Sequence, residues 1–197
     1  MKRIVTLSLL TIVAVSCIQQ EKKDAYNSQA VEMNTLAVEF MQKFKNDSAL
    51  ILSDQAIELD KTYYLPHVNK VKIYLSRNDF SKALSECKTS IDLKPDYAEG
   101  WVMAGILYDL KGDTKHALES YQKSIELYDM KIADRNEKHN IQSNRLNKAV
   151  SLVLIGQEKE GKQELNRLKS EYPEMKITEA FLKLSKKDYL NQLAHQK

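Results

Sequence analysis

The sequence predicts an all-α fold, a solenoid of about four helix-turn-helix units closed by a C-terminal capping helix. The 197 residues include only five Gly and three Pro. These are too few for the many turns of an all-β protein, and helix-forming residues dominate. A pattern of small, aromatic and aliphatic residues also recurs every 34 residues. A period of this length indicates stacked helical repeats.

The N-terminus differs in character from the rest of the chain. A short positive segment, Met1–Arg3, precedes an apolar run of 12 residues, Ile4–Val15. This is the length of a signal-peptide core rather than of a membrane-spanning helix. The small residues that lead into Cys17 resemble the lipobox of bacterial lipoproteins, in which the cysteine is acylated. The resemblance implies a lipoprotein signal peptide at residues 1–16, then an acylated Cys17 and a flexible tether over 17–29.

The expected acylation sets the expected location. Ile18 follows Cys17, whereas an Asp at this place is the common signal that keeps bacterial lipoproteins in the inner membrane. We therefore expect a lipid-anchored protein of the cell envelope, attached to the outer membrane on its periplasmic face or at the surface. Because Ala14 and Val15 depart from the usual lipobox residues, an ordinary secretory signal that contains a cysteine is the alternative.

Helical pairs are expected from Ala30 onward, because the same residue types recur in three successive stretches. A small or medium-sized residue, followed three positions later by an aromatic residue, marks the first helix of each pair. An alanine and a later Ile/Leu pair mark the second helix. The recurring positions are Ala37, Val71 and Gly105; Phe40, Tyr74 and Tyr108; Ala49, Ala83 and Ala117; Ile57, Ile91 and Ile125; and Leu59, Leu93 and Leu127. Small residues where two helices cross allow their backbones to approach closely.

The predicted array covers residues 30–175, and its period is broken once. A polar insert at 132–141 interrupts the pattern, and a shift of ten residues restores it. The four units are 30–63, 64–97, 98–131 and 142–175. Apolar stripes in the remaining residues, 176–197, predict one or two short helices that cap the array.

The third unit resembles the tetratricopeptide repeat. It reads Trp101-x-x-Ala104-Gly105-x-x-Tyr108 and then Ala117-x-x-x-Tyr121, while Pro95 supplies the proline of the preceding unit. These residues nearly match the family pattern. The resemblance implies a solenoid in which the first helices of the units line a concave groove. In this family such a groove usually receives an extended or helical peptide.

The family register assigns residues of both polar and apolar type to this groove. They are Asn34, Val38, Val68, Asn69, Lys72, Glu99, Val102 and Ile106. We expect Lys72 and Glu99 to orient the ligand. Chaperone-binding members of the family hold a C-terminal carboxylate with Lys, Asn and Arg, and only Asn69 matches that set, so chaperone tails are not expected ligands. In the fourth unit the C-terminal cap is an alternative occupant of this surface.

We expect no catalysis, no cofactor and no metal. The sequence has no Cys/His cluster with zinc spacing and no Gly-rich phosphate loop. Removal of residues 1–16 takes away Lys2 and Arg3 and lowers the net charge from +3 to +1. Proteins that bind nucleic acids need a basic stripe. The predicted partners are therefore a protein or peptide and, through the lipid anchor, the membrane, with no nucleic acid or small-molecule substrate.

The predicted function is thus a non-catalytic protein–protein interaction module of the bacterial cell envelope. One alternative is a subunit of an envelope complex, or an immunity-type lipoprotein, that binds through another surface. A second alternative is an enzyme accessory or a hydrolase site in the insert, formed by Asp134, Arg135, Glu137 and His139.

Overall fold

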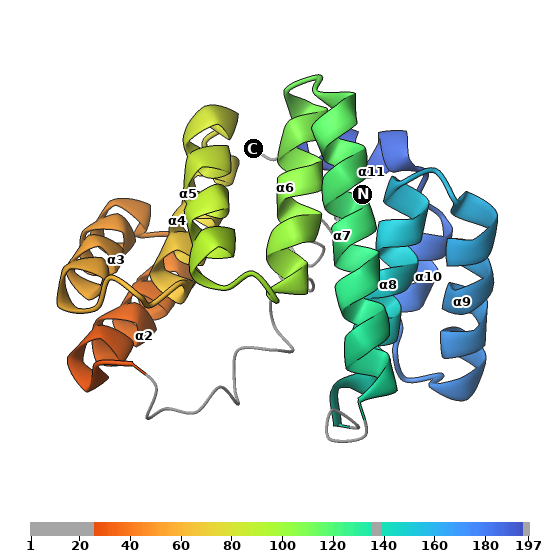
Figure 1. Ribbon diagram of the computed structural model, residues 1–197, viewed down its shortest axis with the longest axis horizontal. Coiled ribbons are helices and arrows are strands. Elements are labelled where there is room, and N and C mark those ends of the chain that lie inside the picture. The colour runs from red at the N-terminus through yellow and green to blue at the C-terminus, as the bar shows by residue number, and fades with distance from the viewer. Residues whose placement is uncertain (1–25, 135–138, 195–197) are drawn as a thin grey trace, which may run out of the picture. The chain divides into compact units, whose positions relative to one another are not determined.

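The computed structural model describes residues 26–134 and 139–194, and all regular structure within them is helical (Figure 1). The all-α prediction is confirmed. Four consecutive pairs are followed by two shorter helices near the C-terminus. The helices are α2 (Ser28–Gln42), α3 (Asn46–Leu59), α4 (Leu65–Ser76), α5 (Phe80–Leu93), α6 (Ala98–Leu110), α7 (Thr114–Ala133), α8 (Ile141–Leu154), α9 (Glu158–Glu171), α10 (Ile177–Leu182) and α11 (Lys186–Ala194).

The described residues form two compact units, 26–100 and 101–194. The first unit contains α2 to α5, and the second contains most of α6 together with α7 to α11. Helix α7 has 20 residues, whereas the equivalent helix α5 has 14, because the insert continues α7 as far as Ala133.

The first helix starts earlier than the predicted tether allows. The side chain of Asn27 accepts hydrogen bonds from the backbone N–H groups of Gln29 and Ala30, at 2.9 and 3.3 Å. Such a cap satisfies amide groups that have no partner within the helix. Helix α2 therefore begins at Ser28. This start places the last two residues of the predicted tether, 17–29, within the helix.

Small residues lie where the two helices of each pair cross. Ala37 and Ala49 are fully buried, as are Ala117 and Ala149. At Gly105, an added Cβ would lie 2.5 Å from Cε1 of Tyr121 on α7. At Gly161 in α9, it would lie 2.6 Å from the carbonyl oxygen of Ala149 on α8. The recurring small residues are thus explained by the close approach of the paired helices.

The four turns within the pairs share one backbone geometry. In each turn, one residue has a positive φ: Phe44 (57°), Asn78 (57°), Gly112 (80°) and Gly156 (96°). Its N–H donates to the carbonyl three residues earlier, and the next N–H donates to the carbonyl five residues earlier. This pair of bonds is the Schellman motif, which ends a helix in the left-handed region that glycine occupies without a Cβ clash.

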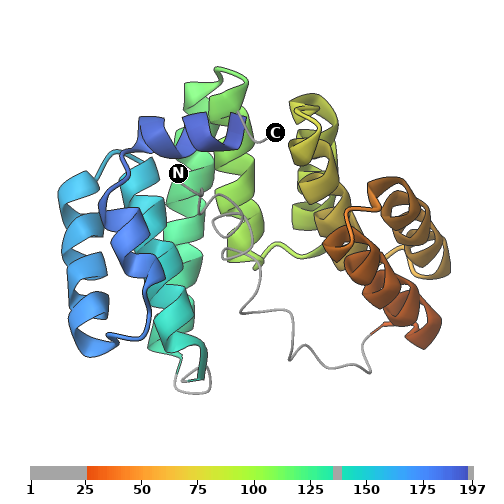
Figure 2. The same ribbon diagram turned by 180° about the vertical axis from the view of Figure 1, so that it is seen from behind.

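The C-terminal helices α10 and α11 pack on the fourth helical pair, α8 and α9 (Figure 2). Helix α10 packs against α9, and Phe181 and Tyr189 close over Val150 and Val153 of α8. The two aromatic rings and both valines are buried. The cap thus fills the surface of the fourth unit, which decides between the two occupants considered for it.

A partly buried polar cluster attaches α11 to the third pair. Asp109 of α6 accepts a hydrogen bond from the hydroxyl of Tyr121, at 2.7 Å, and pairs with Lys186 Nζ, also at 2.7 Å. The Lys186 ammonium group lies 5.3 Å from the centre of the Tyr121 ring. Burial, and then the nearby Asp109 carboxylate, raise the pKa of Tyr121. The tyrosine therefore stays protonated and donates to Asp109.

We predict that Gly105→Ala lowers the free energy of unfolding by about 1–2 kcal/mol, because the new methyl group meets a ring that Asp109 holds in place. Urea denaturation measures the change. In a Tyr121→Leu background the same substitution is expected to be less harmful. Equal effects of Gly105→Ala in the two backgrounds would show that the crossing is not the cause.

Candidate functional site

The first unit brings five of the predicted groove residues together on α2 and α4. The Asn69 side-chain amide donates to Oδ1 of Asn34 at 2.8 Å, and Asn34 in turn donates to the hydroxyl of Tyr63 at 3.2 Å. All three side chains are buried. This chain of hydrogen bonds fixes α2 against α4 and uses both polar groups of the Asn34 side chain and the amide nitrogen of Asn69. Asn34 and Asn69 therefore hold the two helices together.

The accessible part of the predicted groove lies one helical turn further along. Val38 follows Asn34 by four residues, and Lys72 follows Asn69 by three, so each lies on the same helix face as its asparagine. Both side chains are half-buried, whereas Val68, one turn before Lys72, is buried. Val38 and Lys72 thus lie on adjoining stretches of α2 and α4.

Lys72 is a poorly solvated cation. Burial lowers the pKa of its ammonium group to about 8 from the ordinary 10.5. Among residues 26–134 and 139–194, no acidic side chain forms an ion pair with it. A charge that is removed from water without a counter-charge destabilises the folded state. The position is suited to receive an anionic group from a ligand.

The neighbouring Lys70 shows the opposite arrangement. Its ammonium group lies 2.8 Å from both Asp54 and Glu86, and Glu86 also accepts from Nδ1 of His67 at 2.6 Å. Burial alone would raise the pKa of Glu86, but the hydrogen bonds from His67 and Lys70 hold it below its ordinary value. This network connects α3, α4 and α5 and satisfies its own charges. Lys70 and His67 are structural.

The remaining predicted groove residues are buried. Glu99, in the first turn of α6, is 3% exposed, Val102 is 1% exposed and Ile106 is fully buried. Their side chains contribute to packing in this structure, and their role in partner binding stays a prediction. Cys17 and the predicted signal peptide lie outside the described residues, as do Arg135 and Glu137 of the insert.

The described parts of the chain also bear on three other features: metal sites, membrane-spanning helices and a reactive cysteine. No group of three or more His, Cys, Asp or Glu side chains there is placed to hold a metal ion. None of the described helices combines the length and hydrophobicity of a transmembrane segment. Cys87 is buried, and burial raises the pKa of its thiol to about 12. A thiol that stays protonated is a poor nucleophile.

Sequence reasoning missed two features. The cap cluster of Asp109, Tyr121 and Lys186 joins residues too far apart in the chain for any periodic pattern to connect them. The unusual position of Phe44, in contrast, could have been recognised from the repeat period. Phe44 precedes Asn78 by 34 residues and Gly112 by 68, so it occupies the place of the turn glycine, and it is 75% exposed.

Comparisons with known proteins agree with this geometry. Residues 98–129 match the tetratricopeptide repeat family. Over 71 residues, 36% of the chain, the sequence is 32% identical to the heat shock protein sti1 homolog of Schizosaccharomyces pombe. Over 100 residues, 51% of the chain, it is 22% identical to the Hsp70-Hsp90 organising protein of Plasmodium falciparum. The matched segments are 12% and 18% of these relatives, so the chain spans less than a fifth of their length.

Three solved structures share the fold. PilW, a widely conserved type IV pilus biogenesis factor, superposes with a TM-score of 0.62 at 21% identity, over 86% of this chain and 72% of that one. YrrB, a protein with an unusual peptide-binding site, gives 0.51 at 16% identity, over 86% and 81%. The first repeat domain of Spaghetti (RPAP3), bound to an HSP90 peptide, gives 0.50 at 15% identity, over 59% and 90%.

These similarities confirm the predicted TPR-like α-solenoid with C-terminal helices. We conclude that residues 98–129 match the tetratricopeptide repeat and that the described chain has a TPR-like α-solenoid fold.

Proposed function

We propose that the chain is a non-catalytic interaction module that binds a peptide or helix of a partner protein on the surface shared by α2 and α4. The observation that carries this proposal is Lys72, a half-buried cation without an acidic partner in the described residues. Solved proteins of the same fold include one with a peptide-binding site and one bound to a peptide. Binding of a peptide in a groove is a common mode of protein recognition.

The positive charge of Lys72 indicates which kind of peptide would bind. A carboxylate next to Lys72 would supply the missing counter-charge, and Val38 would contact an apolar side chain of the same peptide. An acidic, partly apolar peptide fits these two contacts. We propose that this groove differs from the carboxylate clamp of chaperone-binding members of the family, and the hydrogen bond that the Asn69 amide donates to Asn34 supports this.

The second unit has less room for a ligand on its own surface. Phe181 and Tyr189 cover Val150 and Val153 of the fourth repeat. We therefore assign the ligand to residues 26–100.

We predict that Lys72→Met stabilises the fold at pH 7 by about 1 kcal/mol and weakens binding of acidic peptides about tenfold. The folded-state pKa of about 8 lies below the ordinary 10.5, so the unfolded chain binds more protons between these values. The destabilising effect of Lys72 is complete below pH 8 and fades as the pH rises towards 10.5. Denaturation at several pH values and binding to an immobilised library of acidic, neutral and basic peptides measure both effects.

The control is Lys88→Met, which removes the same charge from an exposed position on α5. It should change neither stability nor peptide selection. Unchanged binding of acidic peptides by Lys72→Met would overturn the proposed site, even if the stability gain is observed.

We also propose that the module is lipid-anchored at Cys17 in a bacterial cell envelope, at the outer membrane. The support is the basic start, the apolar run Ile4–Val15 and the small residues before the cysteine. Acyl chains attach a protein to a membrane by burying their CH₂ groups in the bilayer, without a transmembrane helix.

Metabolic labelling with a palmitate analogue in a bacterial host tests the anchor. The parent chain should incorporate the label and fractionate with outer membranes, and Cys17→Ala should do neither. Label retained by Cys17→Ala would exclude this cysteine as the acylated residue.

A further inference from the structure

The turn between α2 and α3 contains a residue that the local geometry does not favour. Three of the four equivalent turns place Asn or Gly at the positive-φ position, and the first places Phe44 there. Asn and Gly occupy this region readily, but a bulky side chain there is a genuine outlier. The backbone hydrogen bonds of this turn match those of the others, so Phe44 adopts the shared geometry despite its side chain.

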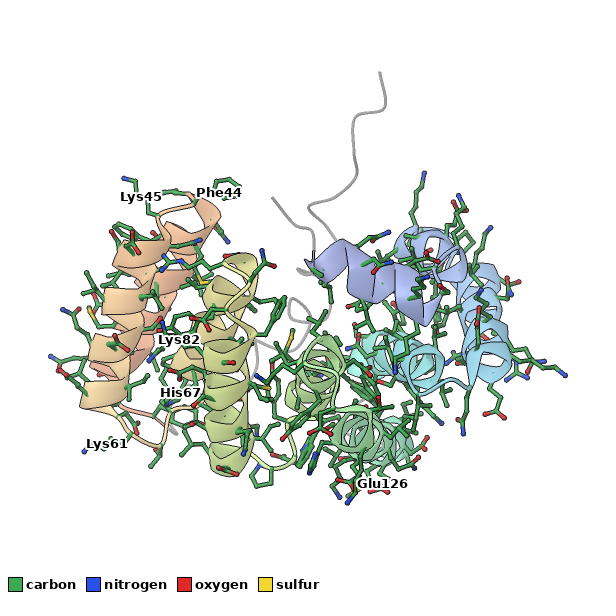
Figure 3. All side chains as sticks on the ribbon, turned by 90° about the horizontal axis from the view of Figure 1, so that it is seen from above. Phe44, Lys45, Lys61, His67, Lys82 and Glu126 are labelled. Atoms are coloured by element: carbon green, nitrogen blue, oxygen red, sulfur yellow. The ribbon has the colours of Figure 1, made fainter. Side chains whose placement is uncertain are left out.

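The Phe44 side chain gains no packing in return. It is 75% exposed, the largest exposed fraction among the large apolar residues of 26–134 and 139–194. Figure 3 shows Phe44 and Lys45 together at the tip of the α2–α3 turn, while Lys61 lies at the opposite end of the pair. A side chain this exposed adds little to the stability of the fold, and the left-handed backbone beneath it is strained. Strain of this kind is typical of binding sites.

The residues around Phe44 are basic. Lys43 and Lys45 flank it and are exposed, and Lys45 Nζ lies 5.8 Å from the centre of the Phe40 ring. Of the acidic residues near it in the sequence, Asp47 pairs with Arg77 at 2.7 Å, and Glu39 lies one turn back along α2. The Phe44 tip (Lys43, Phe44 and Lys45) thus combines one apolar side chain with net positive charge.

We propose that the Phe44 tip contacts the surface of an anionic lipid bilayer. The phenyl ring enters the boundary between headgroups and acyl chains, and the two ammonium groups bind lipid phosphates. An aromatic ring with flanking lysines fits this boundary, where apolar groups bury and cations stay at the headgroups. This proposal rests on the turn and is independent of the peptide site at Lys72.

A bilayer fits the tip better than a protein groove does. A stable protein interface needs a broad, complementary contact area around its central residues. Phe44 has lysines on both sides instead of further apolar residues. Ile51 on α3 is a useful contrast, since it is 60% exposed but has no lysine or arginine within one helical turn of it in the sequence. Without flanking cations it lacks the attraction to an anionic surface, so we exclude Ile51 from the contact.

The test uses the full chain on vesicles of phosphatidylcholine with or without phosphatidylglycerol, containing brominated acyl chains that quench tryptophan. Phe44→Trp and Ile51→Trp each introduce one reporter, and the parent chain gives the background from Trp101. All three share the N-terminal segment, so recruitment through that segment is equal. We expect strong quenching for Phe44→Trp on anionic vesicles, several-fold above Ile51→Trp, and a large loss when Lys43→Glu and Lys45→Glu are added.

Two results would overturn the proposal. One is equal quenching for Phe44→Trp and Ile51→Trp. The other is no quenching for Phe44→Trp while sedimentation shows the chain bound to the vesicles, which would leave a protein partner as the remaining explanation for the tip. A companion variant, Phe44→Gly, should raise the melting temperature and reduce vesicle contact; a lower melting temperature would contradict the strain on which the inference depends.

Discussion

The close crossing of the two helices in each repeat is the constraint on which the rest of the structure depends. Gly105 and Gly161 leave no room for a side chain at their crossings, and buried alanines serve the same purpose elsewhere. The space beside Gly105 is filled by Tyr121, whose hydroxyl reaches Asp109 and, through it, Lys186 of the cap. One close approach thus determines where the next aromatic residue lies and how the C-terminal helix is attached.

The same constraint fixes the turns. Helices that cross closely and are joined by a few residues must reverse direction abruptly, and all four turns do so with one left-handed residue. Glycine and asparagine meet this requirement without strain. Phe44 meets it with strain while its side chain is 75% exposed, and Lys72 is half-buried without an anionic partner in the described residues. In both places the local chemistry departs from what the fold prefers, and we assign a binding role to each.

The period of small and aromatic residues was sufficient to predict the all-α fold, because helix crossing imposes residue size at fixed positions. The register of the family resemblance assigned Val38 and Lys72 to one groove, and the structure places them on adjoining stretches of α2 and α4. The pattern could not show that Asn34 and Asn69 bind each other, since a pattern gives the face of a residue and not its partner. Nor could it show that Phe181 and Tyr189 cover Val150. The contacts of a segment outside the repeats depend on side-chain shape, which a periodic pattern does not describe.

The central claim concerns the turns that join the two helices of each pair. Helix crossing, and not residue type, dictates their backbone conformation, so that even Phe44 adopts a left-handed conformation. Solution NMR of the full chain tests this directly through the three-bond HN–Hα couplings and Cα shifts of residues 44, 78, 112 and 156, together with the Cβ shifts of Phe44 and Asn78. We predict left-handed values at all four positions. A right-handed helical or extended value at Phe44, with left-handed values at the other three, would contradict the account.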